Sequence, residues 1–194
     1  EHIAGLKKNY RNVQSELADL SFVFDTFVDA MPSVEHNAVV TLSLANTRSR
    51  LRMTTLYYFA GINGYLVVGT GNKVEDFGVG FFTKYGDGGV DLSPIADLMK
   101  SEVYELGAFL KVPESILNAP PTDGLFGDDR TDEDQLGASY NELEWAMKMA
   151  EKGNTADQFT GREKEVFEIF TRRNKANQHK MMPIPVCEIP DELK

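Results

Sequence analysis

The residues Gly64-Tyr65-Leu66-Val67-Val68-Gly69 decide the expected fold, because four apolar side chains follow one another without interruption between two glycines. Such a run is typical of a strand that is buried on both faces, the kind found in parallel sheets. Apolar and small residues recur at helical spacing over residues 39–62, and residues 13–20 alternate loosely enough to form an earlier strand. Strand, helix and buried strand in this order predict the α/β class, with a parallel sheet flanked by helices.

Further helices are expected on both sides of this unit. Helical spacing of apolar residues opens the chain and returns over residues 22–31, 100–110 and about 160–175. Two capping-box pairs, in which a side chain at the helix start bonds the N–H three residues on, predict two more helices. These pairs are Thr131 with Asp134 and Ser139 with Glu142.

The composition excludes several classes of protein. The 194 residues suit one globular domain, and they contain no run of about 18 apolar residues that could span a membrane. The start of the chain is too polar for a signal peptide. The lone Cys187 rules out a disulfide framework and a Cys-x-x-Cys metal site, and a single thiol fits a reduced, cytoplasmic setting. A formal charge of −10 argues against a general nucleic-acid binder.

The negative charge is concentrated in one part of the chain. Residues 105–151 carry eleven acidic and three basic side chains, whereas residues 46–104 carry six of each. Near the end of the chain, the donor pair His179 and Lys180 is typical of ordinary surface charge. The central segment therefore keeps enough cations to bind a polyanion locally, although the chain is acidic overall.

The glycine-rich stretch 69–75 directly follows the predicted buried strand. In open α/β sheets, ligands bind beyond the carboxyl ends of the strands, so Thr70 could hydrogen-bond a nucleotide and Glu75 could reach a metal ion. The stretch matches neither the Gly-x-x-x-x-Gly-Lys-Ser/Thr pattern nor the Gly-x-Gly-x-x-Gly pattern. Taken by itself, it favours a tight glycine turn.

A second candidate site lies at residues 81–91, which combine aromatic side chains, a lysine, two aspartates and three glycines. An aromatic face, the Lys84 cation and a carboxylate such as Asp91 would suit the base, phosphate and ribose of a dinucleotide. A hairpin-like turn built on Asp-Gly explains the same composition equally well.

Four central cations are candidates for phosphate binding. Arg48 and Arg52 lie four residues apart and share one helix face, while Arg50 points elsewhere. A solvated face is the ordinary explanation for such a trio, and the residues alone do not choose between the three. Lys100 begins a helix, where the helix dipole is unfavourable for a cation, so an anionic ligand would explain its position.

Taken together, these segments resemble the ammonia-dependent NAD synthetases, a family of the ATP-pyrophosphatase type. The matching segments are residues 46–53, 68–73, 80–91, 120–125 and 131–137, with His179 and Lys180 near the end. The third segment, Gly-Phe-Phe-Thr-Lys-Tyr-Gly-Asp-Gly-Gly-Val-Asp, is the most specific. The similarity is close over residues 40–140 and looser elsewhere, and an ordered set of this length argues against coincidence.

The resemblance implies a Rossmann-like parallel sheet flanked by helices, of the adenine nucleotide alpha hydrolase-like kind, and a ligase activity in NAD biosynthesis. The carboxylate of deamido-NAD would attack the α-phosphorus of ATP, and ammonia would then displace AMP from the adenylated intermediate. Family members are typically homodimers whose partner completes the dinucleotide site. No general base is evident, and an ionised carboxylate needs none in order to be nucleophilic.

By motif match, the resemblance also assigns roles to individual residues. ATP and its phosphates would contact Thr70, Lys100 and Thr122. Glu75 would ligate Mg²⁺, which neutralises and orients the phosphates. Deamido-NAD would be bound by Arg50, Lys84, Asp91, His179 and Lys180.

Two departures from the family pattern modify these expectations. The Ser-Gly-Gly-x-Asp-Ser loop, which cradles pyrophosphate in the family and supplies a second Mg²⁺ ligand, is absent from these residues. We therefore expect residues 1–194 to form a single NAD synthetase-type domain that is N-terminally truncated, lacks the first strand and the phosphate loop, and has impaired activity. The stretch 74–80 is one residue longer than in many members, so either Glu75 or Asp76 could face the metal, and we choose Glu75.

The sequence also leaves other functions open. A non-catalytic dinucleotide-binding or dimerisation module would keep the deamido-NAD residues and dispense with the loop. Other ATP-pyrophosphatase enzymes that form amides share the general fold but not the motif at 80–91. The acidic residues 128–134 either stabilise the first turn of a helix, by about 0.3–1 kcal/mol, or form a lid that orders when substrates bind.

Overall fold

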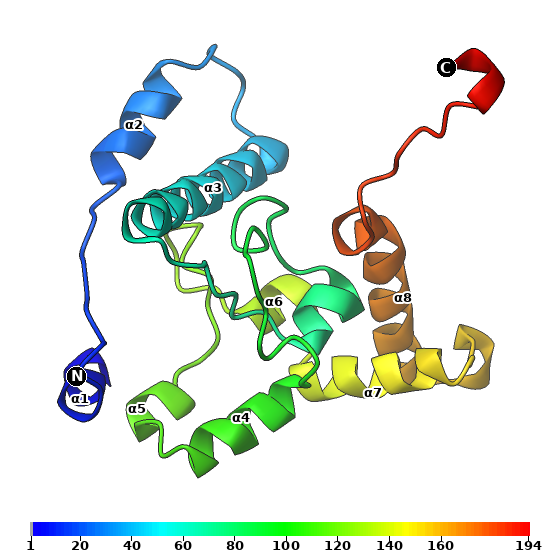
Figure 1. The fold of residues 1–194 in the computed structure, drawn as a ribbon. Coiled ribbons are helices and arrows are strands. Elements are labelled where there is room, and N and C mark those ends of the chain that lie inside the picture. The colour runs from blue at the N-terminus through cyan, green and yellow to red at the C-terminus, as the bar shows by residue number, and fades with distance from the viewer. Residues whose placement is uncertain (1) are drawn as a thin grey trace.

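The computed structural model describes residues 2–194, and its regular elements are helices (Figure 1). No helix in this range is both long and apolar enough to cross a membrane. The α-helices are α1 (His2–Asn9), α2 (Ser21–Asp29), α3 (Ala38–Asn63), α4 (Lys100–Phe109), α5 (Glu114–Leu117), α6 (Asp132–Leu136), α7 (Tyr140–Glu151) and α8 (Gly161–Met181). The other turns are the π-helix η1 (Val74–Val79) and the 3₁₀-helices η2 (Ala156–Gln158) and η3 (Asp191–Leu193).

The prediction of a parallel sheet is wrong. The described part of the chain contains no β-strand, and the predicted buried strand forms one isolated parallel bridge, between Val68 and Leu92. The segment is extended at this point, since the Gly69 N–H donates to the Leu92 carbonyl at 2.7 Å. Val67 is buried, but Leu66 and Val68 are 64% and 53% exposed. The second face of the apolar run is therefore uncovered.

The earlier strand predicted for residues 13–20 is likewise absent from the described chain. These residues are irregular, and Leu17 is 98% exposed. An apolar run indicates a tendency to be buried, whereas a sheet also requires neighbouring strands that take up each N–H and C=O group. Because that second condition is not met here, the Rossmann-like sheet that the resemblance implied is absent from residues 2–194 too.

The helices predicted from spacing and capping are confirmed. α3 begins after Asn37, whose side-chain oxygen accepts hydrogen bonds from the N–H groups of Val39 at 2.9 Å and Val40 at 3.1 Å. It ends at Gly64, whose φ of 65° is in the left-handed region that favours glycine. Both predicted capping boxes form, at the starts of α6 and α7, and α8 runs further than the spacing indicated.

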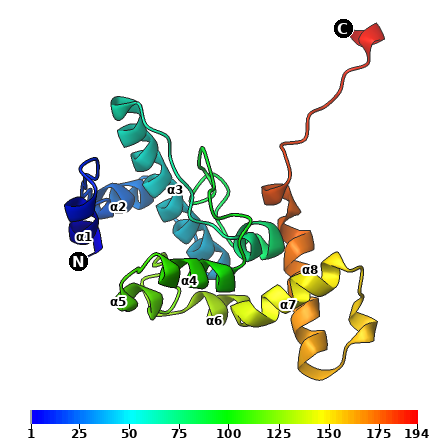
Figure 2. The same ribbon diagram turned by 60° about the horizontal axis from the view of Figure 1, so that its bottom comes forward.

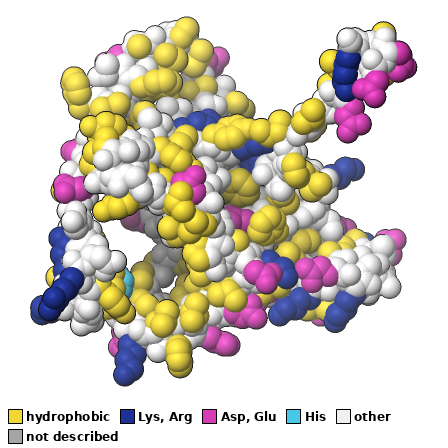
Figure 3. Space-filling model, in the orientation of Figure 1, with side chains coloured by type: hydrophobic (Ala, Val, Ile, Leu, Met, Phe, Trp, Pro, Cys, Tyr) yellow, Lys and Arg dark blue, Asp and Glu magenta, His cyan; other side chains and the backbone are white. Residues whose placement is uncertain are grey.

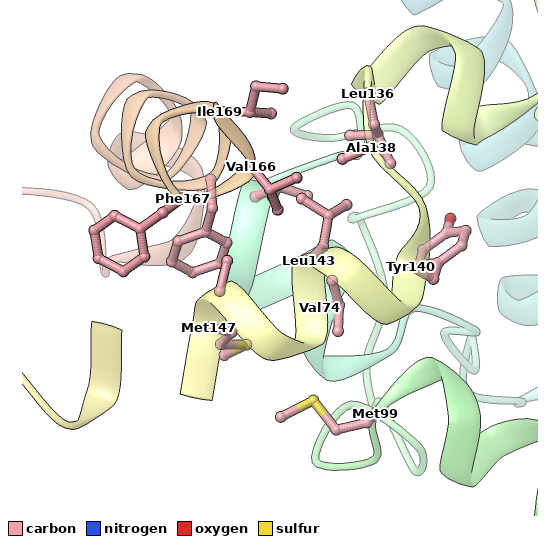
Figure 4. Packing of buried hydrophobic residues seen from close by; sticks show 13 residues of the cluster. Val74, Met99, Leu136, Ala138, Tyr140, Leu143, Met147, Val166, Phe167 and Ile169 are labelled. Carbon is pink, nitrogen blue, oxygen red and sulfur yellow. The ribbon is translucent and has the colours of Figure 1, made fainter. Parts of the chain in front are cut away.

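The main hydrophobic core lies where η1, α7 and α8 pack together (Figure 4). Leu143 of α7 and Val166 of α8 are almost fully buried, as is Val74 of η1. The backbone of η1 approaches both helices closely, because a Cβ at Gly78 would lie 3.3 Å from the Met147 sulfur. The other buried residues of this cluster are Val79, Met99, Leu136, Ala138, Tyr140, Ala146, Met147, Phe167, Ile169 and Phe170.

The region of α2 and α3 is packed differently. The two helices lie side by side (Figure 2). Large apolar residues remain exposed on them, so hydrophobic side chains appear over this part of the surface (Figure 3). The exposed apolar residues of α2 and α3 include Phe22, Val23, Phe27, Val39, Leu42, Leu56, Tyr58 and Ile62. On α3 these residues lie on more than one side of the helix.

The chain after α8 extends away from the helices in both ribbon views and ends in η3 (Figures 1 and 2). Its apolar residues Ile184 and Val186 are exposed, and so is Cys187. This tail therefore takes no part in either packed region.

Candidate active-site cleft

A cleft of about 920 Å³ lies between α3, η1, the start of α4 and α8. Its volume is within the range of roughly 300–1,000 Å³ that is typical of small-molecule sites. Five of the nine site residues predicted from the sequence line it, although they come from separate segments of the chain. These five are Thr70, Glu75, Lys100, Thr122 and Lys180.

Glu75 lies at the centre of the polar groups in the cleft. Its Oε1 accepts a hydrogen bond from the Tyr140 hydroxyl at 2.6 Å and pairs with Lys100 Nζ at 2.9 Å. The Lys100 ammonium also lies 4.6 Å from the centre of the Tyr140 ring. Burial, followed by the negative charge of Glu75, raises the pKa of Tyr140 well above its usual value, so the hydroxyl keeps its proton and acts as a donor.

The position of Lys100 at the start of α4 has an explanation within the chain. An ammonium group is unfavourable at this positive end of a helix, and the sequence suggested that an anionic ligand compensates for it. In the structure the anion is the Glu75 carboxylate, and the side chains of both residues are less than one-fifth exposed. Lys100 is therefore already paired.

Asp132, the first residue of α6, contributes a second carboxylate to this part of the cleft. It is 8% exposed; its Oδ2 lies 3.2 Å from the Tyr140 hydroxyl, and its buried Oδ1 has no hydrogen-bond partner among the described residues. Burial raises its pKa. Carboxylate oxygens are the ligands that Mg²⁺ prefers, so the unpartnered oxygen of Asp132 and the carboxylate of Glu75 fit such an ion chemically. No group of three metal-binding side chains occurs within residues 2–194.

Glu75 and Asp76 face different spaces, although they are neighbours in η1. Asp76 lies at a second pocket of about 160 Å³, together with Asp87 and Lys180. A Cβ at Gly71 would come within 2.2 Å of Asp76 Oδ2, so a side chain there would require the Asp76 carboxylate to move. Burial raises the pKa of Asp76 to about 6, with smaller contributions from the charges of Glu75 and Asp87.

The other four predicted site residues do not line the main cleft. Arg50 Nε donates to the Lys84 carbonyl at 3.3 Å, and Lys84 Nζ donates to the His179 carbonyl, so these three residues are linked. Asp91 is separate from them, and its Oδ2 accepts from the Val67 N–H at 2.7 Å. In this structure Asp91 supports the isolated bridge.

Lys180 connects α8 to the turn at residues 81–91. Its Nζ donates to the carbonyls of Gly80 at 2.8 Å and Phe82 at 2.7 Å, and burial lowers the pKa of its ammonium group. Because Lys180 lines both the main cleft and the second pocket, it lies at the boundary between them.

The turn at residues 81–91 is fixed against α3 by polar contacts. Asp87 Oδ1 accepts from the Ser49 hydroxyl at 2.7 Å and from the Thr83 N–H at 3.0 Å. A Cβ at Gly86 would lie 2.2 Å from the Ser49 oxygen, so glycine allows this close approach. Both sequence interpretations of this stretch, a turn and a wall of a binding site, are compatible with this geometry.

Arg48 and Arg52 share one face of α3, as the spacing predicted, and Arg50 points elsewhere. Arg48 Nη1 donates to the Leu125 carbonyl at 2.9 Å, and Arg52 donates to the carbonyls of Asp123 and Gly124 at 3.1 Å each. The two guanidinium groups therefore hold the segment that carries Thr122 against α3.

Three residues were not predicted from the sequence: Asp132 and Arg173, which line the cleft, and Tyr140, which contacts Glu75 beside it. Asp132 was considered only as part of an acidic helix start, and Tyr140 was not considered, although the capping box at Ser139 places it at the start of a helix. Arg173 of α8 also lines the cleft; it donates to the Gln135 carbonyl, and its buried Nε has no partner within residues 2–194. Only capping gave a signal for the position of Tyr140, and none indicated its contact with Glu75.

Residues 7–183 match the family model described as NAD synthase. Curated relatives include the NH(3)-dependent NAD(+) synthetase of Methanosarcina mazei, which is 37% identical over 184 residues, covering 93% of this chain and 70% of that protein. The protein of the same description from Syntrophomonas wolfei is 44% identical over 149 residues, covering 77% of this chain and 55% of its own length.

Two solved structures are similar to this chain in fold. The NMN synthetase of Francisella tularensis superposes with a TM-score of 0.74 and 29% identity, covering 93% of this chain and 68% of the other. The NH3-dependent NAD synthetase of Campylobacter jejuni, solved in complex with nitrate ion, superposes with a TM-score of 0.65 and 25% identity, covering 95% and 72%. The similarity thus extends over almost the whole chain in both sequence and structure.

Proposed function

The chain belongs to the NAD synthase family, and from this membership we propose that it catalyses the ATP-dependent amidation of deamido-NAD by ammonia. In this ligase reaction of NAD biosynthesis, the deamido-NAD carboxylate attacks the α-phosphorus of ATP, and pyrophosphate leaves. Ammonia then attacks the adenylated carbonyl carbon, and AMP leaves as the amide forms. The observation that carries the proposal is that five residues matched by motif line one cleft of about 920 Å³.

ATP is placed by Thr70, Lys100 and Thr122 in this proposal. The two threonines are exposed at the cleft, where their hydroxyls can donate to phosphate or ribose oxygens. Lys100 is paired with Glu75 in the present structure, and the more highly charged phosphates would compete for its ammonium group.

Mg²⁺ would be held by Glu75, with Asp132 as a second oxygen donor in the same part of the cleft. The ion supplies positive charge that neutralises the phosphates and orients them for attack. The chain's own residues contribute positioning and electrostatic stabilisation. No general base is needed, because the attacking carboxylate is already ionised at neutral pH.

Deamido-NAD would be bound by Lys180 in the cleft and by Arg50, Lys84, Asp91 and His179 beside it. The cationic groups of Arg50 and Lys84 are engaged with main-chain carbonyls. A phosphate would compete with these neutral carbonyls, because its negative charge adds an attraction between opposite charges to the hydrogen bond.

A homodimer is part of the proposal, and the exposed apolar residues of α2 support it. Phe22 is 81% exposed and Val23 47%, and exposed apolar surface marks interaction sites. A cytoplasmic location remains a prediction from the single thiol.

A second candidate is amidation of the corresponding mononucleotide. The observation that favours it is the TM-score, which is 0.74 for the NMN synthetase and 0.65 for the NAD synthetase. Competition between deamido-NAD and nicotinic acid mononucleotide at equal concentrations measures the ratio of the two kcat/KM values. If kcat/KM is higher for nicotinic acid mononucleotide than for deamido-NAD, the mononucleotide is the substrate.

The proposal is tested by NAD formation from ATP, deamido-NAD and ammonia, with each substrate omitted in turn. We expect turnover that depends on all three, and a slow rate because the phosphate loop is absent from these residues. Glu75→Gln should lower the rate by at least the roughly 10–100-fold that loss of an outer-shell metal partner causes. Glu105→Gln, an exposed change on α4, is the matched control.

The alternative function gives a different result in the same preparation. A non-catalytic module would bind deamido-NAD in a calorimetric titration, with weaker binding by Lys84→Ala, and would form no NAD. Binding without turnover would therefore overturn the enzymatic proposal in favour of the module.

A further inference from the structure

Both donors that contact Glu75 hold the same one of its two carboxylate oxygens. Oε1 receives the Tyr140 hydroxyl at 2.6 Å and Lys100 Nζ at 2.9 Å, while Oε2 has no hydrogen-bond partner among the described residues. We propose, on the basis of the function above, that Tyr140 is a positioning residue whose hydroxyl fixes Glu75 so that Oε2 faces the cleft to take the divalent cation that accompanies ATP.

Tyr140 is rigid enough for this role. Its side chain is 5% exposed, and its ring belongs to the main hydrophobic core, at whose edge Figure 4 shows it. The Tyr140 N–H donates to Glu133 Oε1 at 2.8 Å, and the Ser139–Glu142 capping box closes the same helix start. Arg162 in turn holds Glu142 at 2.7 Å. The hydroxyl is thus carried on a packed ring at a capped helix end.

The Tyr140 hydroxyl can donate one hydrogen bond, and the carboxylates of Glu75 and Asp132 both lie near it. The distance to Glu75 Oε1 is 2.6 Å and the distance to Asp132 Oδ2 is 3.2 Å, so Glu75 is the closer acceptor. Asp132 is left with a buried, unpartnered Oδ1 on the same side of the cleft. The cluster therefore has more carboxylate oxygens than donors, and a bound cation would satisfy the excess.

The two donors of Glu75 differ in what happens to them when nucleotide binds. The Lys100 ammonium is drawn toward the phosphates in the proposed reaction, which weakens its pairing with Oε1. The Tyr140 hydroxyl has no charge to be attracted in this way, so it becomes the principal group that orients Glu75. Loss of the hydroxyl should consequently affect metal binding more strongly in the presence of nucleotide than in its absence.

The test measures Mn²⁺ binding by electron paramagnetic resonance, with and without the uncleavable analogue α,β-methylene-ATP. Tyr140→Phe keeps the ring and removes only the hydroxyl, and we expect its Mn²⁺ affinity with the analogue to fall by about 10–100-fold. Its affinity for the analogue without metal should be unchanged, which a general loss of structure would not allow. Tyr104→Phe, on α4 and 37% exposed, is the matched control and should bind as the wild type does.

Each outcome decides the proposal. Equal Mn²⁺ affinity of Tyr140→Phe and the wild type, or an equal loss with and without the analogue, overturns the role of Tyr140. A wild type that adds nothing to the affinity of Mn²⁺ for the free analogue overturns it as well, because Glu75 then holds no cation. NAD formation is scored separately: weakened Mn²⁺ binding without any NAD formation supports the positioning role and overturns the proposed function instead.

Discussion

Two walls of the cleft are held together by different forces. The first is formed by α8 and Glu75 of η1, which belong to the η1–α7–α8 core, and the second is formed by α3. The first wall buries its apolar side chains, among them Leu143 and Val166. The second wall leaves much of its apolar surface exposed and is fixed by polar contacts, such as Arg52 to main-chain carbonyls and Ser49 to Asp87. Regions with few buried apolar contacts open at lower free energy, so the α3 wall should be the more adjustable of the two.

The largest expected effect comes from deleting core volume in the first wall. Leu143→Ala should lower the free energy of unfolding by about 2–5 kcal/mol, because Leu143 is fully buried and its removal leaves a cavity. Leu42→Ala on α3, where the side chain is 53% exposed, should change it by no more than about 0.5 kcal/mol. Urea denaturation followed by circular dichroism measures both, and equal losses would contradict the contrast between the walls.

A smaller effect is expected where the second wall has a tight polar contact. Gly86→Ala places a methyl group 2.2 Å from the Ser49 oxygen, and we expect a loss of about 1–3 kcal/mol from overpacking. Gly61→Ala on the same helix as Ser49 meets open space and should stabilise the protein by about 0.5–1 kcal/mol. Thermal unfolding of the two variants should show shifts of opposite sign, and a shared sign would rule out the steric explanation.

The second pocket should make the stability of the protein depend on pH through Asp76. Its pKa is raised to about 6 in the folded protein from 3.8, so the folded state favours the protonated form. Stability from this group is therefore fully present below the ordinary pKa of 3.8 and is lost as the pH rises from there through about 6. Because part of the carboxyl remains solvated, the loss is about 1–2 kcal/mol after allowance for screening.

Asp76→Asn removes this titration and isolates its effect. The variant and the wild type should have similar unfolding free energies at pH 4, and the variant should be the more stable at pH 7. Denaturation curves at half-unit steps between these values give the difference, and parallel curves for the two proteins would show that Asp76 titrates normally.

The smallest effect concerns the segment that α3 holds. Arg52→Ala removes hydrogen bonds to the carbonyls of Asp123 and Gly124, and it should cost about 0.5–1.5 kcal/mol while speeding proteolytic cleavage over residues 123–130. Arg50→Ala, on the same helix but without contacts to that segment, should leave the cleavage rate unchanged. If ATP and deamido-NAD together do not slow cleavage of the wild type, the lid interpretation of residues 128–134 is excluded.

The helices were predictable because local signals specify their ends, whereas residues of the cleft were indicated only by the motif match. Asn37 and Gly64 mark the ends of α3 by chemistry that acts within a few residues. The spacing does not determine which side of α3 is buried, since the apolar residues Tyr58 and Ile62 are each 63% exposed. Burial depends on what packs against a helix, and periodicity reports only that one side is apolar.

The sheet and the environment of Glu75 were not predictable for a different reason. Val68 has a single bridge partner 24 residues away, and no property of residues 65–68 reveals how many partners they have. Tyr140 and Glu75 are 65 positions apart, so their contact exists only through the packing of α7 against η1. Local composition indicates which secondary structure a segment prefers, whereas long-range packing determines which residues it contacts.

The number of residues in the π-helix η1 determines the directions in which its side chains point. A π turn contains more residues than an α turn. In η1, Glu75 lies at the main cleft, Asp76 lies at the second pocket, and Gly78 packs against Met147. One residue corresponds to about 100° of rotation on an α-helix. Removing a single residue from Val74–Val79 would therefore rotate the carboxylates of Glu75 and Asp76 away from their pockets relative to Gly78, even if all three residues were kept.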